Sequence, residues 1–198
     1  MAIAAPSRRR AIEDVASTLF REHGYAGTSV RDIARALSIQ GASLYAHVTS
    51  KEDVLWAIVE RAAADFEQSA DRAERQLPAS SGAVDRIGSL VRAHVNVVAH
   101  DPELANVFVH EWRHLNGERR AAVLERRDSY ERRFRQLIAE GMATGELLPT
   151  DPAVAATFIL TALNGLATWY DPDGRLSPDR IADHYVGFAV RALTEDHS

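Results

Sequence analysis

Side chains suited to contacting DNA are concentrated between Thr28 and Lys51, in the sequence TSVRDIARALSIQGASLYAHVTSK. Gly41, Ala42 and Ser43 are slim enough to let the first turn of a helix enter the major groove. Gln40 could read an adenine edge, while Ala42 and Ser43 could meet a thymine methyl group or either base. Around them are hydroxyl, imidazole and cationic groups that can hold phosphate oxygens, namely Thr28, Ser29, Arg31, Tyr45, His47, Ser50 and Lys51. The alternative is that these side chains form only the solvated face of a helical hairpin.

A second pattern, His110-Glu111-Trp112-Arg113-His114, matches the H-E-x-x-H motif of zinc proteases. On one helix, histidines four residues apart share a face and could bind zinc, with Glu111 as the general base. The predicted helix is short, however, Glu111 falls on an apolar stripe, and no clear third ligand is present. We therefore predict no metal and no cofactor, and retain His110 and His114 as weak candidates for a metal-binding protein or a metal-dependent hydrolase.

Two short helices joined by a turn would position the DNA-contacting residues. Val30, Ile33, Ala34 and Leu37 recur at the spacing of one helical face, and Thr28 or Ser29 supplies an N-cap hydroxyl. Ser38 to Gly41 breaks this pattern, and Leu44 and Val48 are the inward positions of the next helix. These features predict a helix-turn-helix.

The rest of the chain reads as successive helices with no convincing strand. Ile12, Val15, Ala16, Leu19 and Phe20 form a first stripe that Gly24 ends. Asp-Pro and Ser-Pro pairs mark later helix starts. The predicted later helices span residues 50–76, 83–100, 101–115, 117–143, 151–170 and 177–193. The fold class is therefore all-α, with about nine helices.

The N-terminal part of the sequence resembles the tetracycline-repressor (TetR) family of bacterial transcriptional regulators. The matching run is AIEDVASTLFREHGYAGTSVRDIARALSIQGASLYAHVTSKEDVL, from Ala11 to Leu55. In that family the first helix braces the reader, and the second and third form the helix-turn-helix. The resemblance implies a DNA-binding domain at residues 1–50 and a helical effector-binding and dimerisation domain at 51–198. Val48 replaces the usual phenylalanine, and Gln40 replaces a common capping serine or threonine.

Polar residues interrupt the apolar stripes of the second domain, and buried polar groups need partners. Each could belong to a satisfied structural network, but together they suggest a cavity with polar anchors in an aromatic wall. The predicted effector-binding residues are His94, Phe108, Glu111, Trp112, Arg127, Tyr130, Phe134, Asn164 and Trp169.

The segments FVHEWRHL, RRDSYERRFRQLIAEG and LNGLATWYDPDGRLSPDRIADHY more loosely resemble a TetR branch whose effectors are often acyl-CoA thioesters. A CoA ligand would need cations for its phosphates. Seven arginines of the 117–143 helix could supply them or could form a solvated face with neighbouring acids: Arg119, Arg120, Arg126, Arg127, Arg132, Arg133 and Arg135. An acyl-CoA thioester is thus one candidate effector, and an unspecified hydrophobic or aromatic molecule is the other.

A single helix-turn-helix contacts few base pairs, so we expect a two-fold homodimer on a nearly palindromic double-stranded operator. The last two helices carry small and aromatic residues that suit a four-helix interface or the chain's own core. The predicted interface residues are Phe158, Ala162, Gly165, Leu166, Ile181, His184, Tyr185 and Phe188.

The charge distribution agrees with a DNA-binding head on an acidic body. Residues 1–51 have seven cationic and four acidic side chains, a net charge of +3, whereas the other 147 residues carry −8. Arg8–Arg10 could be an arm that touches DNA or a short solvated charge run. The absence of cysteine excludes disulfides, thiol catalysis and cysteine-bound metals.

No signal-peptide pattern and no stretch of roughly 20 apolar residues is visible. We therefore expect a cytoplasmic, non-membrane protein that regulates transcription and is not an enzyme.

Overall fold

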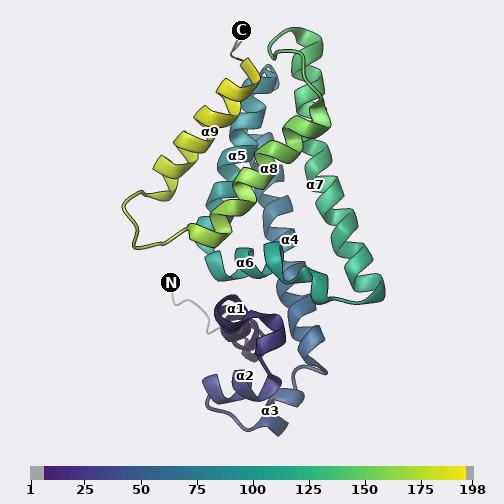
Figure 1. Ribbon diagram of the computed structural model, residues 1–198, viewed down its shortest axis with the longest axis vertical. Coiled ribbons are helices and arrows are strands. Elements are labelled where there is room, and N and C mark those ends of the chain that lie inside the picture. The colour runs from purple at the N-terminus through teal and green to yellow at the C-terminus, as the bar shows by residue number, and fades with distance from the viewer. Residues whose placement is uncertain (1–6, 195–198) are drawn as a thin grey trace. The chain divides into compact units, whose positions relative to one another are not determined.

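The computed structural model describes residues 7–194, which form nine α-helices and one short 3-10 helix (Figure 1). The helices are α1 (Arg8–Gly27), α2 (Val30–Ala36), α3 (Gly41–Tyr45), α4 (Lys51–Gln76), α5 (Ala83–His100), α6 (Pro102–His110), η1 (Trp112–His114), α7 (Gly117–Thr144), α8 (Pro152–Trp169) and α9 (Pro178–Thr194). The predicted all-α class is confirmed.

The chain forms two compact units that do not follow its linear order. The first, here the reader unit, comprises the residues up to Ala63 together with Glu103–Val123. The second, the body unit, comprises Ala64–Pro102 and the residues from Leu124 onward. The chain therefore passes from one unit to the other at 63/64, 102/103 and 123/124.

Helix α1 opens the reader unit and contains a sharp bend at Gly24. Gly24 has φ 73°, a conformation that favours glycine because it has no Cβ. Ile12, Ala16 and Phe20 lie on the apolar face of α1 and are buried. Glycine at this position therefore ends the straight part of the helix, as its place after the apolar stripe predicted.

A tight turn joins α2 to α3. Ser29 and Asp32 cap the start of α2 reciprocally, because each side chain accepts the backbone N–H of the other residue. At the far end Ser38 adopts φ 54°, and the Ile39 amide donates to the Ala34 carbonyl at 3.0 Å. This turn sends the chain directly into α3, whose Leu44 is fully buried.

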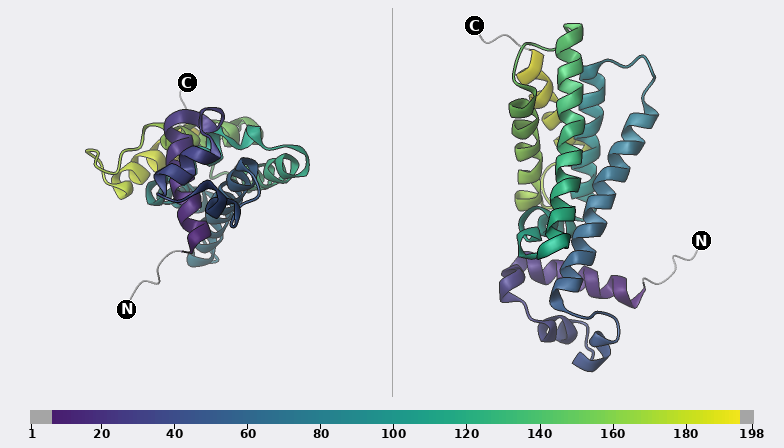
Figure 2. Two further views of the ribbon diagram at one scale, coloured as in Figure 1. Left: turned by 90° about the horizontal axis from the view of Figure 1, so that it is seen from below. Right: turned by 90° about the vertical axis from the view of Figure 1, so that its right-hand side faces the viewer.

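The body unit is built around α5, on which both α8 and α9 pack (Figure 1). A Cβ added at Gly88 of α5 would lie 3.3 Å from the Val186 side chain of α9, which shows how closely these helices approach. Figure 2 shows α4 and α7 as long ribbons, and two ion-pair groups join them within the body unit. Arg126 bonds to Glu67, and Arg133 pairs with Asp71 and Glu74.

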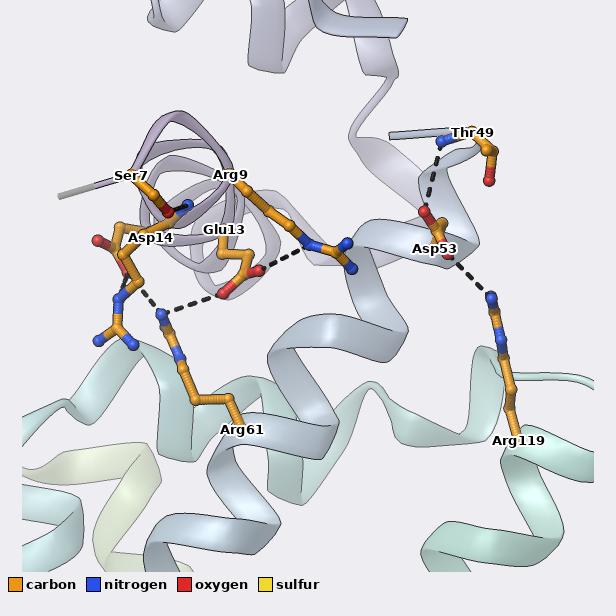
Figure 3. Close-up of polar contacts among 9 residues, drawn as sticks. Ser7, Arg9, Glu13, Asp14, Thr49, Asp53, Arg61 and Arg119 are labelled. Atoms are coloured by element: carbon orange, nitrogen blue, oxygen red, sulfur yellow. Dashed lines mark hydrogen bonds and ion pairs between the residues drawn. The ribbon is translucent and has the colours of Figure 1, made fainter. Parts of the chain in front are cut away.

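Two sequence-based predictions differ from the structure. The helix expected over residues 101–115 ends at His110, and a 3-10 turn follows. Arg8–Arg10 also do not form a flexible arm, because these residues are the first turn of α1; their contact with DNA stays a prediction. Arg9 pairs with Glu13 (Figure 3). Arg10 pairs with Asp14. Residues 1–6, on which part of the signal-peptide prediction rests, lie outside the described residues.

By length and composition, α8 alone among the described helices could cross a membrane. Its buried residues include Ala156, Ile159 and Leu163, and it packs on α5 and α9. A core helix of a globular domain passes the same test, so we assign α8 to the body unit.

Candidate functional site

The start of α3 presents the predicted base-reading residues to solvent. Gln40, Ala42 and Ser43 are exposed, and Gly41 is half-buried. Gln40 is the N-cap residue, yet its side chain makes no capping hydrogen bond. Its amide is therefore not used to stabilise the helix, and the slim first turn of α3 offers a surface that a major groove can accept.

Most of the residues predicted to hold phosphate also lie on the surface. The exposed set comprises Ser29, Arg31, Tyr45, His47 and Ser50. Tyr45 is 57% exposed, so its ring and hydroxyl are open to solvent. The Ser29 hydroxyl is already engaged by Asp32, which lowers the pKa of the Asp32 carboxyl through their hydrogen bonds.

Thr28 is a correction, because it is only 2% exposed and cannot reach DNA from this position. Its hydroxyl lies 3.2 Å from the Leu19 carbonyl oxygen and 3.0 Å from the Gly24 carbonyl oxygen and donates to them. Thr28 therefore stabilises the bent end of α1. The sequence marked a hydroxyl beside a helix start but not the carbonyl groups that it serves.

Lys51 likewise has a structural position. Its Nζ donates to the carbonyl oxygens of Tyr25 and Thr28, both at 2.9 Å, and lies 4.1 Å from the centre of the Tyr25 ring. The first residue of α4 thus closes the end of α1. Lys51 thus joins two parts of the reader unit, and its phosphate contact stays a prediction.

Residues 103–123, here called the clasp, come from the middle of the chain and fold into the reader unit. Arg21 bonds to Glu103 at 2.8 Å, and the Tyr25 amide donates to the Glu111 carboxylate at 3.1 Å. The His114 ring stacks on the Tyr25 ring with 5.0 Å between centroids. Each contact fixes the end of α1, from which α2 begins.

The clasp also holds the first turn of α4. Asn116 donates from its amide and side chain to Glu52, and Arg119 bonds to Asp53 at 2.9 Å. Burial acts to raise the pKa of Asp53, but hydrogen bonds from the Thr49 amide and Arg119 outweigh it and keep this pKa below its ordinary value. Figure 3 shows Asp53 between Thr49 and Arg119.

The clasp contains the zinc motif and three of the predicted effector residues, whose contact with an effector stays a prediction. Glu111, Phe108 and Trp112 belong to the reader unit, and the Glu111 carboxylate serves Tyr25 and lies 3.4 Å from His114 Nε2. Because α6 ends at His110, the two histidines of H-E-x-x-H are not presented by one helix. Within residues 7–194 no three His, Asp or Glu side chains are grouped as metal ligands.

Within the body unit, four predicted effector residues lie in one neighbourhood. His94 of α5 is 3% exposed, and its Nδ1 lies 3.4 Å from the Tyr130 hydroxyl of α7. Phe134 follows Tyr130 one turn later, with 5.8 Å between ring centroids, and Arg127 is close enough to influence His94 electrostatically. Burial, aided by the Arg127 charge, lowers the pKa of His94 to about 3. The imidazole is therefore neutral.

Phe66 is the residue of this neighbourhood that the sequence-based prediction missed. Its ring centroid lies 4.6 Å from that of His94 and 6.0 Å from that of Tyr130. It is the bulky aromatic member of the inward stripe of α4 that also contains Leu55, Val59 and Ala62. The apolar spacing of this stripe is the sequence pattern that could have predicted an inward position for Phe66. We call Phe66, His94, Tyr130 and Phe134 the aromatic cluster.

The arginines predicted to meet CoA phosphates are partly committed to the protein. Arg119, Arg126 and Arg133 pair with acids of α4. Arg120 lies 5.9 Å from the Trp112 ring centre. Arg132 is exposed, while Arg127 and Arg135 are half-buried. The alternative of a face paired with acids thus fits several of these residues, although the acids belong to α4.

An apolar groove with a volume of about 590 Å³ lies between α8 and α9. Trp169 lines this groove and is exposed, and Asn164 of α8 is half-buried; the contact of these two residues with an effector stays a prediction. Phe158 and Phe188 are 61% and 59% exposed, and Ala162 and His184 are also exposed. Gly165 and Tyr185 are half-buried.

Two predicted interface residues need correction. Leu166 is fully buried, and Ile181 is nearly so, within the single chain. Leu166 belongs to the core, whereas Ile181 forms part of the floor of the groove. The remaining exposed aromatic residues are the part of the predicted interface that a second molecule could cover.

Comparisons with known proteins cover both parts of the chain. Residues 12–58 match the family model for bacterial regulatory proteins of the tetR family. Residues 80–193 match the model for the tetracyclin repressor-like C-terminal domain. The HTH-type transcriptional repressor KstR2 of Mycolicibacterium smegmatis is 27% identical over 192 residues, which cover 96% of this chain and 92% of KstR2.

Solved structures show the same architecture. A tetR-family regulatory protein from Rhodococcus RHA1 has a TM-score of 0.84 and 26% identity, and the match covers 97% of this chain and 100% of that one. AibR, in complex with isovaleryl coenzyme A and operator DNA, has a TM-score of 0.81 and 31% identity. That match covers 92% of this chain and 97% of AibR.

Proposed function

The chain belongs to the TetR family of bacterial regulatory proteins, and we propose that it leaves a palindromic operator when an acyl-CoA thioester binds. As a family member it is a transcriptional repressor regulated by a ligand, and not an enzyme. We place its activity in the cytoplasm, where the bacterial operator is. Within the family, operator DNA, a small-molecule effector and a second copy of the chain are the partners.

The observation that carries the DNA-binding proposal is the exposed first turn of α3. Gln40, Ala42 and Ser43 are available for base contacts, while Tyr45 and His47 are available for phosphates. In a two-fold dimer the two α3 helices would enter successive major grooves about 34 Å apart. A palindromic operator follows from that symmetry.

An acyl-CoA effector is supported by a relative and by the chemistry of the body unit. AibR, 31% identical, has been crystallised with isovaleryl coenzyme A. The aromatic cluster offers apolar rings beside one buried imidazole, which suits the acyl end of the thioester, an apolar chain with a single polar group.

Selection of random duplexes with the purified protein tests this function. The selected site is expected to be palindromic. Competition then compares isovaleryl-CoA and longer acyl-CoA thioesters with the matching free acids and with CoA alone. Release by a thioester but by neither of its parts supports the proposal. A selected site that none of these molecules releases contradicts the acyl-CoA assignment, and no sequence preference at moderate salt contradicts the regulator assignment.

A charge-matched pair of variants tests which face meets DNA. Arg31→Ala is expected to weaken binding to all duplexes and to reduce the salt slope by about one, because a phosphate contact is lost. Arg72→Ala removes the same charge from an exposed position of α4 in the body unit. Equal effects of the two substitutions would contradict a specific contribution of the reader face.

We further propose that the groove between α8 and α9 is covered by the same groove of a second copy. Its exposed aromatic residues, Phe158, Trp169 and Phe188, form an apolar surface of the kind that marks an interface. A self-complementary face agrees with the two-fold symmetry that a palindromic operator requires.

A further inference from the structure

His94 has one nitrogen whose hydrogen-bonding capacity is unused. Nδ1 faces the Tyr130 hydroxyl at 3.4 Å, whereas Nε2 is closed to solvent and has no hydrogen-bond partner among the described residues. Buried polar groups in folded proteins are nearly always paired, so an unpaired one requires an explanation. A bound molecule that supplies the missing partner is such an explanation.

The protonation state of His94 defines what this partner must be. Burial keeps the imidazole neutral, so one nitrogen carries a hydrogen and the other accepts. A phenol is a stronger hydrogen-bond donor than a neutral imidazole, so we assign the Tyr130 hydroxyl as the donor to Nδ1. In this tautomer the hydrogen of His94 lies on Nε2, which needs an acceptor.

The surroundings of Nε2 restrict the acceptor further. Phe66 from α4 and Tyr130 from α7 place aromatic rings beside the α5 imidazole, and the Phe134 ring lies beside that of Tyr130. An apolar group packs well against these rings, and a carbonyl oxygen satisfies one N–H without burying a charge. The charged groups that influence this pair are Arg127, Arg133 and Glu74, so a carboxylate is the competing ligand chemistry.

We propose that His94 Nε2–H binds the uncharged carbonyl oxygen of the effector, and that the aromatic cluster holds the apolar group attached to it. This inference rests on the proposed function and narrows it: the acyl carbonyl of the thioester, and not the CoA end, is recognised at His94. Since Nε2 is closed to solvent, the effector has to displace the side chains that cover it. The Phe66 ring, whose centroid lies 4.6 Å from that of the imidazole, belongs to α4, the helix that begins directly after the DNA-reading segment.

His94→Leu tests the role of the N–H group. The concentration of acyl-CoA that releases half of the operator should rise at least tenfold, while operator affinity without effector stays unchanged. The melting temperature without ligand should stay the same or rise, because an unsatisfied polar atom leaves the core. His94→Gln, which keeps an N–H donor, should retain most of the response. His100→Leu is the matched control, the same exchange at an exposed histidine of α5.

A pair of small probes separates this inference from the acyl-CoA assignment. Acetophenone, an uncharged aromatic ketone, should raise the melting temperature of the wild-type protein but not of His94→Leu, and benzoate should raise neither. If acetophenone behaves in this way while no acyl-CoA releases the operator, the carbonyl site stands and the acyl-CoA effector is wrong.

Three results would overturn the inference. They are equal stabilisation of wild type and His94→Leu by acetophenone, stabilisation by benzoate alone, and no stabilisation of the wild type by either probe. Should His94→Leu fail to fold, the nitrogen-15 spectrum of the wild-type histidines decides the matter. Acetophenone must then shift the Nε2–H signal of one buried imidazole, and an unchanged signal refutes the carbonyl contact.

Discussion

The imidazole of His94 links the stability of the protein to pH. Its pKa is 6.5 as an ordinary value and about 3 in the folded chain, so the unfolded chain binds a proton more readily between these values. The stabilisation is complete above pH 6.5 and is lost progressively as the pH falls toward 3.

We therefore expect the free energy of unfolding to fall by about 2 kcal/mol between pH 7 and pH 5 through this residue alone. Denaturant titrations at the two pH values measure it. In His94→Leu the fall should be smaller by that amount, whereas His100→Leu should follow the wild type. An identical pH profile in all three proteins would show that His94 does not titrate in this way.

Thr28 offers a second test with a single hydroxyl. Thr28→Val keeps the side-chain shape and removes the donor that serves the Leu19 and Gly24 carbonyl groups. We expect a loss of about 1–3 kcal/mol in stability because buried acceptors lose their partner. Thr28→Ser keeps the donor and should lose less. A Thr28→Val protein with normal stability but weaker DNA binding would restore the phosphate contact that the sequence suggested.

Single residues also show where sequence reasoning stops. The exposure of Gln40, Ala42 and Ser43 followed from the apolar spacing around them, because a helix that buries Leu44 must turn those neighbours outward. The positions of Thr28 and Lys51 did not follow. Their partners are main-chain carbonyl groups, which every residue type carries and no sequence pattern marks.

At the scale of the helices, capping residues predicted the start of α8 correctly. The end of α6 differs from the prediction because a long-range contact decides it. Asp151 accepts the amides of Ala153 and Val154, so α8 begins where the Asp-Pro pair predicted. At the end of α6 the apolar spacing continues through Trp112, yet the helix stops at His110. The Glu111 carboxylate there accepts the amide of Tyr25, 86 residues away, a contact that local periodicity does not contain.

That contact makes the clasp testable as an element. Glu111→Leu removes the acceptor of the Tyr25 amide beside the bend from which α2 starts. We expect a stability loss of about 1–3 kcal/mol and weaker operator binding, since the reader helices lose one of their fixed points. Glu111→Gln retains a carbonyl acceptor and should bind the operator nearly as well as wild type. Electrophoretic mobility shifts measure operator binding, and thermal unfolding measures stability. If both variants bind the operator equally well, the contact between Glu111 and Tyr25 does not support DNA binding.

For the molecule as a whole, the proposed dimer makes affinity depend on assembly. Phe188→Asp places a charge on the exposed aromatic surface of the α8–α9 groove. We expect monomers in analytical ultracentrifugation and a loss of operator affinity of roughly 10²-fold, because the two half-sites are no longer bound together. Leu124→Asp changes an exposed apolar residue of α7 outside the groove and is the control. A Phe188→Asp protein that remains dimeric would place the interface elsewhere.

The division into a DNA-binding domain at residues 1–50 and an effector-binding domain at 51–198 remains a proposal. The two compact units contain different residues, because the reader unit also includes residues up to 63 and the clasp. Sequence order alone could not show that residues 103–123 fold with the reader, because the joining groups lie far apart in the chain. The sequence did predict a positively charged N-terminal segment, because the net charge of residues 1–51 depends on composition alone.

The clasp has a consequence for the exchange of DNA-reading domains between family members. A chimera that joins residues 1–63 to a foreign body would leave the Tyr25 amide, Glu52 and Asp53 facing side chains that were selected for another head. Operator specificity therefore depends on two separate segments of the sequence, residues 1–63 and the clasp. A graft of this reader unit has to include both segments. Mutations that change the operator specificity of one segment limit the substitutions that the other can tolerate.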